Sequence, residues 1–208
     1  HFPCTEQSAQ RLIRMGQEEW RIKVVGPLGI YAMPEAEFLS KKQICEKLGL
    51  DASREIVLVI QHPVSTQVSQ AGEQMRITLE AVKDFQSVVI YPNNDLGSQD
   101  MIKVIEDSGV KAFKNLPYLE FLSLLKSSSV IVGNSSTGLY EAALFNIPAV
   151  NIGWRQGNRE HALNVVSVVH NKEMIRRAVN ECVKKIKPYI PYWNPFDNKV
   201  DGVKVIMD

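Results

Sequence analysis

Residues 130–145 read VIVGNSSTGLYEAALF, an apolar run that breaks into small polar residues and then resumes with helical spacing. The β-branched run at its start is typical of a buried strand. The turn GNSSTG at 133–138 places two glycines and three hydroxyl side chains where the strand passes into a helix. The start of a helix has free backbone N–H groups and binds anions. The stretch therefore predicts a strand–turn–helix unit with a candidate anion site.

Further apolar runs alternate with helical patterns along the chain. Strands are predicted at 22–26, 56–60, 87–91, 110–113, 129–133 and 148–152. Helices are predicted at 72–85, 100–109, 118–128 and 172–187, from the N-cap Thr5 to just before Gly16, and as a short last element within 199–208. Continuous Val/Ile strands alternating with helices indicate a parallel sheet covered on both faces. The expected fold class is α/β, a doubly wound, Rossmann-like parallel sheet.

Composition narrows the function classes. The chain has 208 residues, 45% of them hydrophobic, which suits one globular domain or at most two small ones. A net charge of +1 gives no general attraction to nucleic acid or to an anionic membrane. No apolar run approaches the roughly 20 residues of a membrane-spanning helix, and the start shows no signal-peptide pattern. Three widely spaced cysteines argue against a disulfide framework, so we expect a cytoplasmic protein without a structural zinc site.

Polar turns follow four of the predicted strands. They are Gln-His-Pro at 61–63, Pro-Asn-Asn-Asp-Leu-Gly-Ser at 92–98, the turn at 133–138, and Gly-Trp-Arg-Gln at 153–156. In doubly wound sheets, ligands bind in the crevice outside the carboxyl ends of the strands. Because all four turns belong to that one edge, the sequence predicts a ligand site there. The turn at 133–138 is not a P-loop, since no lysine follows its glycine.

Several residues of this edge have a functional and a structural interpretation. Gly133 and Gly138 would let the backbone approach an anion, whereas serine or threonine before a helix is also a common N-cap. Glu141 would accept two hydrogen bonds from a ribose diol, or would only stabilise the first turns of its helix. His62 is either a site residue or a packed histidine. Arginine matches the geometry of phosphate oxygens, which favours Arg155 and leaves Arg159 open to being a solvated surface residue.

These motifs together resemble the hydrolysing UDP-N-acetylglucosamine 2-epimerases, the enzymes that make N-acetylmannosamine for sialic acids and related sugars. The resemblance covers nearly the whole chain in order. It rests on the motifs CTEQSAQRLIRMG, VVGPLGI, HPV, YPNNDLGS, GNSSTGLYEAALFNIPAVNIG, RQGNRE, NVV and NPF. The family is similar in architecture to the two-domain glycosyltransferase-B fold, in which Rossmann-like halves close over a UDP-sugar.

The resemblance implies roles for particular residues. His62 matches the histidine beside the phosphates and the reacting sugar, and Asn93 lies in the active-site cleft. Ser135 and Ser136 match the serines that hold the diphosphate. Glu141 matches the glutamate that binds the uridine ribose, and Arg155 matches the arginine of the nucleotide pocket. We also place Gly133, Asp95, Gly138 and Arg159 at the UDP site. Two departures, Trp154 and the early glycine of QGN, leave the identity of the sugar open.

The resemblance also implies a reaction and a missing part. The family eliminates UDP to leave a 2-acetamidoglucal-like intermediate and then adds water, whereas related non-hydrolysing enzymes add UDP back. The acidic residues for proton transfer belong to an N-terminal domain, so residues 1–208 are expected to be the single C-terminal, UDP-binding domain. Residues 1–20 and 188–208 are then junction and crossover segments. Such a fragment alone is expected to be inactive.

Partners and cofactors follow from the same resemblance. We expect UDP-N-acetylglucosamine or a related UDP-sugar as ligand, no nucleic-acid or membrane partner, and a homo-oligomer for the full-length protein. The resemblance identifies no definite cofactor, and a divalent cation such as magnesium is a candidate. The alternatives are a non-hydrolysing epimerase, the donor-binding domain of a glycosyltransferase, and a nucleotide-binding module without chemistry.

Overall fold

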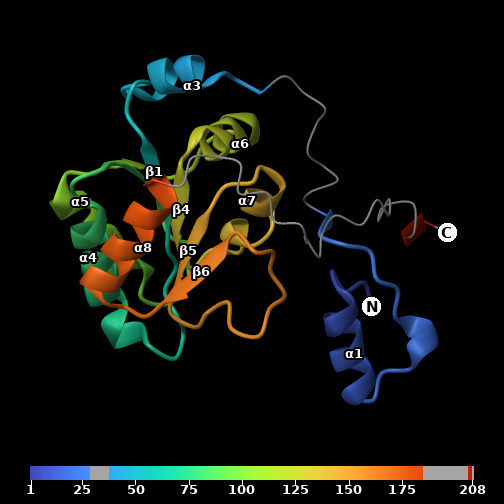
Figure 1. Cartoon of the computed structure of the whole chain (residues 1–208). Coiled ribbons are helices and arrows are strands. Elements are labelled where there is room, and N and C mark those ends of the chain that lie inside the picture. The colour runs from blue at the N-terminus through green and yellow to red at the C-terminus, as the bar shows by residue number, and fades with distance from the viewer. Residues whose placement is uncertain (29–37, 185–205, 208) are drawn as a thin grey trace.

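A computed structural model describes residues 1–28, 38–184 and 206–207. Its six strands are all parallel and form one sheet in the order β3-β2-β1-β4-β5-β6 (Figure 1). The strands are β1 (Ile56–Ile60), β2 (Gln86–Ile90), β3 (Lys111–Phe113), β4 (Val130–Gly133), β5 (Ala149–Ile152) and β6 (Val165–Val168). The order runs outward in both directions from the central pair β1 and β4. The predicted doubly wound parallel sheet is therefore confirmed.

The α-helices are α1 (Glu6–Arg14), α3 (Lys41–Leu48), α4 (Ala71–Val82), α5 (Ser98–Ser108), α6 (Tyr118–Ser127), α7 (Glu141–Leu144) and α8 (Lys172–Lys184). Three short 3₁₀ turns are η1 (Glu19–Arg21), η2 (Val68–Gln70) and η3 (Ser136–Gly138). Helix α1 begins as predicted, with the Thr5 hydroxyl accepting from the amide of Ser8 at 3.2 Å. It lies away from the sheet, and Arg11 reaches the main-chain carbonyl of Asn158 (Figure 1).

The sheet separates two apolar cores, because successive side chains of a strand point to opposite faces. On β1, Val57 and Val59 join the core under α4, α5 and α8. On the same strand Leu58 faces the core under α3, α6 and α7. All five residues of β1 are buried, as expected for a strand covered by helices on both faces.

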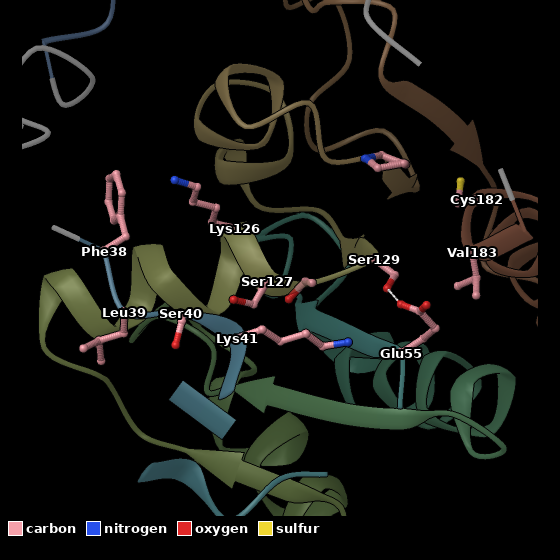
Figure 2. A pocket seen from close by; sticks show the side chains of 12 residues that line it. Phe38, Leu39, Ser40, Lys41, Glu55, Lys126, Ser127, Ser129, Cys182 and Val183 are labelled. Carbon is pink, nitrogen blue, oxygen red and sulfur yellow. Dashed lines mark hydrogen bonds between the residues drawn. The ribbon is translucent and has the colours of Figure 1, made fainter. Parts of the chain in front are cut away.

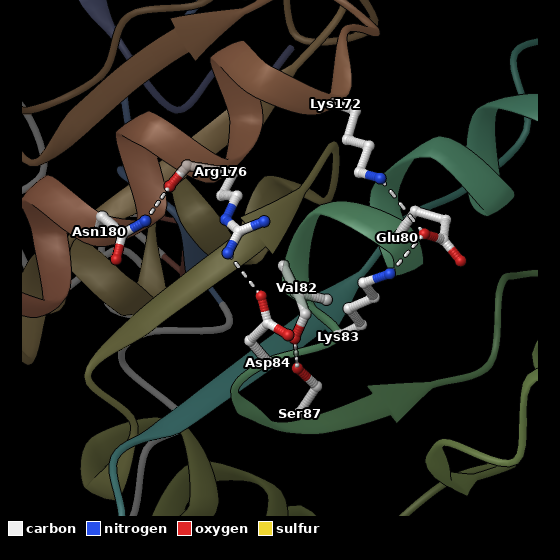
Figure 3. A network of polar contacts seen from close by, with 8 residues as sticks. All are labelled: Glu80, Val82, Lys83, Asp84, Ser87, Lys172, Arg176 and Asn180. Carbon is white, nitrogen blue, oxygen red and sulfur yellow. Dashed lines mark hydrogen bonds and ion pairs between the residues drawn. The ribbon is translucent and has the colours of Figure 1, made fainter.

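Helices α4 and α8 pack together on one face and carry a polar network on their outer side (Figure 3). Glu80 pairs with Lys83 at 3.2 Å and with Lys172 at 3.4 Å, while Arg176 pairs with Asp84 at 2.6 Å. These side chains are all substantially exposed to solvent, and pairs of this kind stabilise a protein by only about 0–1 kcal/mol. The buried apolar residues beneath them are therefore the main source of the α4–α8 association.

One predicted strand is wrong. Residues 22–26 do not join the sheet. The amides of Lys23 and Val25 instead donate to the carbonyls of His1 and Pro3, both at 3.0 Å. The apolar run thus satisfies its backbone by pairing with the first residues of the chain, which leaves the sheet edge to other strands.

The structure also adds elements that the sequence patterns did not predict. Strand β6 forms one edge of the sheet, and its central residues are exposed. Its sequence VVSV is rich in valine, so the apolar signal was present but was not assigned to a strand. Helix α3 begins with a capping box between Ser40 and Gln43. Helix α8 is described to Lys184, and the predicted junction at 188–208 and last helix within 199–208 lie almost wholly outside the described residues. No helix within the described ranges is long and apolar enough to cross a membrane.

The α4–α8 contact leads to a stability prediction. Ile175 of α8 is completely buried, so Ile175→Ala should lower the free energy of unfolding by about 2–5 kcal/mol. Arg176→Gln, one residue away and on the exposed side, should cost less than about 1 kcal/mol. Denaturant-induced unfolding of both variants measures the two values. A larger loss for Arg176→Gln would show that the ion pairs, rather than apolar burial, hold α8 in place.

Candidate functional site

The carboxyl ends of β1 and β4 meet where the strand order reverses, and the two strands approach very closely there. Gly133 ends β4 beside Ile60, the last residue of β1. A Cβ atom on Gly133 would lie 2.1 Å from the carbonyl oxygen of Ile60, and its φ is +134°. Only glycine fits this position. The loops after β1 and β4 therefore leave the sheet side by side.

Asn134 joins these two loops. Its side-chain Oδ1 accepts from the amide of His62 at 2.7 Å, and its Nδ2 donates to the carbonyl of His62 at 2.9 Å. Its own amide donates to the carbonyl of Ile60 at 3.1 Å. Only about 1% of Asn134 is exposed, so these bonds are shielded from water. The main chain of His62 is thereby fixed relative to β4.

His62 in turn contacts the loop after β2. The amide of Asn93 donates to the imidazole Nδ1 at 3.0 Å, so Nδ1 is an acceptor and the proton of the neutral ring is on Nε2. Burial, and then the nearby charge of Arg155, lower the pKa of His62 to about 4, against a smaller opposing effect of Asp95. At neutral pH His62 is therefore an uncharged hydrogen-bond donor through Nε2.

The loop after β5 brings two further side chains to the same point. The carbonyl of Asn134 accepts from Arg155 Nη1 at 3.2 Å and from Gln156 Nε2 at 2.7 Å. Burial lowers the pKa of Arg155, and the negative charge of Asp95 partly offsets this effect. Asp95 also accepts from the side chain of Asn93 at 2.6 Å. Loops from four strands thus meet in one hydrogen-bonded cluster. Its members are His62, Asn93, Asp95, Asn134, Arg155 and Gln156.

The turn at residues 133–138, called the serine turn from here on, differs from the helix start that the sequence predicts. Ser136 to Gly138 form the 3₁₀ turn η3, and α7 begins only at Glu141. The carbonyl of Gly138 accepts from the side chain of Asn164 at 3.3 Å. Within the described part of the chain, the amides of Ser135 and Ser136 donate to no protein acceptor. Two free donors therefore remain at the turn, although no long helix follows them.

Glu141 is a mostly buried carboxylate at the start of α7. Burial raises its pKa, and its Oε2 is shielded from water without a hydrogen-bond partner among the described residues. An unpartnered buried carboxylate costs stability, so a ligand that donated hydrogen bonds to it would relieve that cost. Glu141 is the first residue of α7, directly at the start of the helix.

The structure brings several predicted site residues together, and the charge of Arg159 acts on Arg155 from nearby. His62, Asn93, Asp95 and Arg155 meet in the cluster, and Ser135 follows Asn134 directly. Arg159 is exposed and hydrogen-bonds the hydroxyl group of Tyr140.

The two glycines of the serine turn have packing reasons of their own. Gly133 is required by the carbonyl of Ile60, and a Cβ on Gly138 would lie 3.3 Å from that of Ala149. Their contact with a ligand stays a prediction, as do all the assigned UDP contacts.

Two residues of the cluster were missed from the sequence, Asn134 and Gln156. Both are buried polar residues directly beyond strand ends, and the available signal was their position within the polar turns. What each side chain bonds to depends on the neighbouring loops, which sequence spacing does not reveal. The described residues contain no group of three His, Cys, Asp or Glu side chains that would hold a metal ion.

A separate cavity lies elsewhere in the described part of the chain. It measures about 630 Å³ and is lined by residues before the starts of β1, β4 and β5 and by the end of α8 (Figure 2). Lys41, Lys126 and Glu55 point into this region, and Ser129 hydrogen-bonds Glu55. Because these residues belong to the amino ends of the strands, the cavity is at the opposite edge of the sheet from the cluster. It contains none of the predicted site residues.

Comparison with known proteins agrees with the resemblance. Residues 1–202 match the family described as UDP-N-acetylglucosamine 2-epimerase. The chain is 35% identical over 200 residues to a UDP-N,N'-diacetylbacillosamine 2-epimerase (hydrolyzing) of Legionella pneumophila, covering 93% of this chain and 52% of that protein. It is 29% identical over 187 residues to a UDP-N-acetylglucosamine 2-epimerase of Neisseria meningitidis, covering 87% and 49%. The chain spans about half the length of these relatives.

A solved structure shares the fold. The crystal structure of UDP-N-acetylglucosamine 2-epimerase from Neisseria meningitidis bound to its UDP-sugar matches with a TM-score of 0.71 and 17% identity. The match covers 100% of this chain and 60% of that one. The sheet therefore has the architecture of the glycosyltransferase-B type of epimerase, as predicted.

The environment of His62 makes stability depend on pH. The unfolded histidine has a pKa of 6.5 and the folded one a pKa of about 4, so between these values only the unfolded chain binds the proton. The free energy of unfolding should fall as the pH falls through this window, by up to about 3 kcal/mol from His62. Unfolding of wild type and His62→Gln at several pH values measures the effect. Parallel pH curves for the two proteins would contradict it.

Proposed function

Because the chain belongs to the UDP-N-acetylglucosamine 2-epimerase family, we propose that it is the UDP-binding half of a hydrolysing enzyme of this family. The reaction converts UDP-N-acetylglucosamine and water to N-acetylmannosamine and UDP, for sialic-acid-type sugar synthesis. The observation that carries the proposal is the cluster of His62, Asn93 and Arg155 at the reversal of the strand order. The relative from Legionella, named as hydrolyzing, supports the hydrolytic outcome.

The diphosphate is assigned to the donors of the cluster. Arg155 supplies a guanidinium, His62 the Nε2–H, Ser135 and Ser136 their two amides, and Ser136 its hydroxyl. Charge-assisted hydrogen bonds to phosphate are about twice as strong as neutral ones. A neutral His62 suits this role, because it donates a hydrogen bond without needing a proton from solvent. Partial burial of Arg155 strengthens its attraction to an anion.

The ribose is assigned to Glu141. A ribose diol has two hydroxyl donors, and Glu141 offers a shielded carboxylate with an unpartnered oxygen. The diphosphate subsite therefore consists of hydrogen-bond donors, whereas the ribose subsite offers a hydrogen-bond acceptor to the sugar hydroxyls. This division matches the chemistry of a nucleoside diphosphate, which is anionic at one end and rich in hydroxyl donors at the other.

The chemistry then divides between two halves of the full-length protein. A base removes the C2 proton, the C1–oxygen bond breaks, and its electron pair leaves with UDP, giving a 2-acetamidoglucal. Addition of water across the double bond gives N-acetylmannosamine. The cluster stabilises the negative charge on the departing diphosphate, and we assign the base to the part of the longer relatives that this chain does not span.

A resident metal ion is not part of the proposal. The described residues provide no cluster of metal ligands, and Asp95 is the carboxylate nearest to Arg155 and His62 in the cluster. The donor set does not fit a bound magnesium ion held by the protein alone, so no step is assigned to one.

Glu141 is the test of the nucleotide assignment. Glu141→Ala removes two hydrogen bonds to the ribose, each worth about 0.5–1.5 kcal/mol net, so UDP affinity should fall roughly tenfold or more. Glu173→Ala on α8, an exposed glutamate far from the cluster, is the matched control and should bind UDP like wild type. Calorimetric titration with UDP measures both. An unchanged affinity for Glu141→Ala would place the ribose elsewhere.

The division of labour is tested with the 208-residue chain itself. It should bind UDP weakly yet release neither N-acetylmannosamine nor UDP from UDP-N-acetylglucosamine, because closure by a second domain excludes water and supplies the base. Adding the other half of the longer protein should restore turnover. Turnover by the chain alone, at the rate of an intact epimerase, would show that the whole reaction is carried out here.

A further inference from the structure

Asn134 uses every polar group it has. Its amide donates to Ile60, its side chain forms two bonds to the main chain of His62, and its carbonyl accepts from Arg155 and Gln156. One buried residue thus connects the loops after β1, β4 and β5. Through Nδ1 of His62 the same set of bonds extends to the loop after β2.

The shape of the asparagine side chain explains why it fits this place. An amide group presents one acceptor and one donor side by side, which complements the N–H and C=O of a single residue. Aspartate has the acceptor but lacks the donor, so its second oxygen would face the carbonyl of His62. A serine hydroxyl is too short to form both bonds. The two contacts at 2.7 and 2.9 Å therefore specify asparagine.

We propose that Asn134 is a positioning residue of the UDP site, which sets His62 and Arg155 relative to each other without itself contacting the ligand. The identity of the ligand, UDP, rests on the proposed function. The geometry of the inference rests only on the hydrogen bonds of Asn134. By holding the main chain of His62, Asn134 brings the imidazole Nδ1 to the amide of Asn93 and directs Nε2–H away from it. By accepting from Arg155, it restrains the guanidinium beside the serine turn.

The positioning role has a consequence that does not depend on UDP. Without the two bonds from Asn134, the loop after β1 is free to move, and His62 loses its shielded position against Asn93. The imidazole then becomes easier to protonate, because its low pKa comes mainly from burial. A residue with a purely structural role would lower stability without changing this titration.

The experiment compares three variants of this chain, Asn134→Ala, the milder Asn134→Ser and the control Ser128→Ala. Ser128 is equally buried, lies just before β4 rather than just after it, and its hydroxyl bonds the carbonyl of Leu124 at 2.7 Å. Nitrogen-15 NMR follows the titration of His62, calorimetry measures UDP affinity, and denaturant unfolding measures stability. The His62 signal is assigned from its absence in His62→Gln.

In Asn134→Ala, the pKa of His62 should rise from about 4 toward 6.5, and UDP affinity should fall about tenfold. Asn134→Ser should show a smaller rise in the pKa of His62 and a smaller loss of UDP affinity. This variant replaces Asn134→Ala in the test if the alanine variant does not fold. Ser128→Ala should lose stability only. A folded Asn134 variant with the wild-type His62 titration would overturn the inference. If wild type failed to bind UDP, the proposed function would fail, while a raised pKa in Asn134→Ala would still uphold the positioning of His62.

Discussion

The close approach of β4 to β1 is the constraint on which the rest of the structure depends. The carbonyl of Ile60 lies where a Cβ of residue 133 would be, so glycine is required and the two strand ends are in direct contact. This contact is also where the strand order reverses. Because the chain folds outward on both sides of it, the loops after β1 and β4 have no helix between them, and the crevice opens there.

Because the loops lie so close together, some of their buried polar atoms are hydrogen-bonded to each other and others have no partner in the part of the chain that the structure describes. Asn134 pairs its own polar groups with the main chain of Ile60 and His62 and with the side chains of Arg155 and Gln156. Other polar atoms remain shielded and unpartnered among the described residues, including Oδ1 of Asn93, Oε2 of Glu141 and Oε1 of Gln156. Each such atom costs about 1–3 kcal/mol unless water or a ligand pairs with it. Rigid donors beside unpaired acceptors are a pattern expected of a binding site rather than of a packed core.

The cluster and the cavity of about 630 Å³ lie at opposite edges of the same sheet. The lysines of that cavity already have partners: Lys41 bonds the carbonyl of Arg54, and Lys126 lies over the ring of Phe38. The chemistry of the clustered side chains, rather than cavity volume, therefore marks the candidate site.

Apolar periodicity was enough to predict the sheet, its parallel arrangement and the edge that carries the polar turns. Inner strands such as β1 are covered on both faces, so every residue is apolar and the signal is strong. The edge strand β6 and the helix break before Glu141 were not predicted. The valines of β6 lie in a short run with an exposed centre, and the carbonyl of Gly138 accepts a hydrogen bond from Asn164, far along the chain.

The sequence by itself determined the family, the fold class and most of the candidate residues, because strand ends in a parallel sheet share one edge and their polar turns can be read directly. Only the tertiary structure decided how those residues act. The protonated nitrogen of His62 follows from the amide of Asn93, and its low pKa from burial beside Arg155. Asn134 gained its importance from two bonds to a residue 72 positions away. Hydrogen bonds between loops depend on distances and directions that spacing along the chain does not encode.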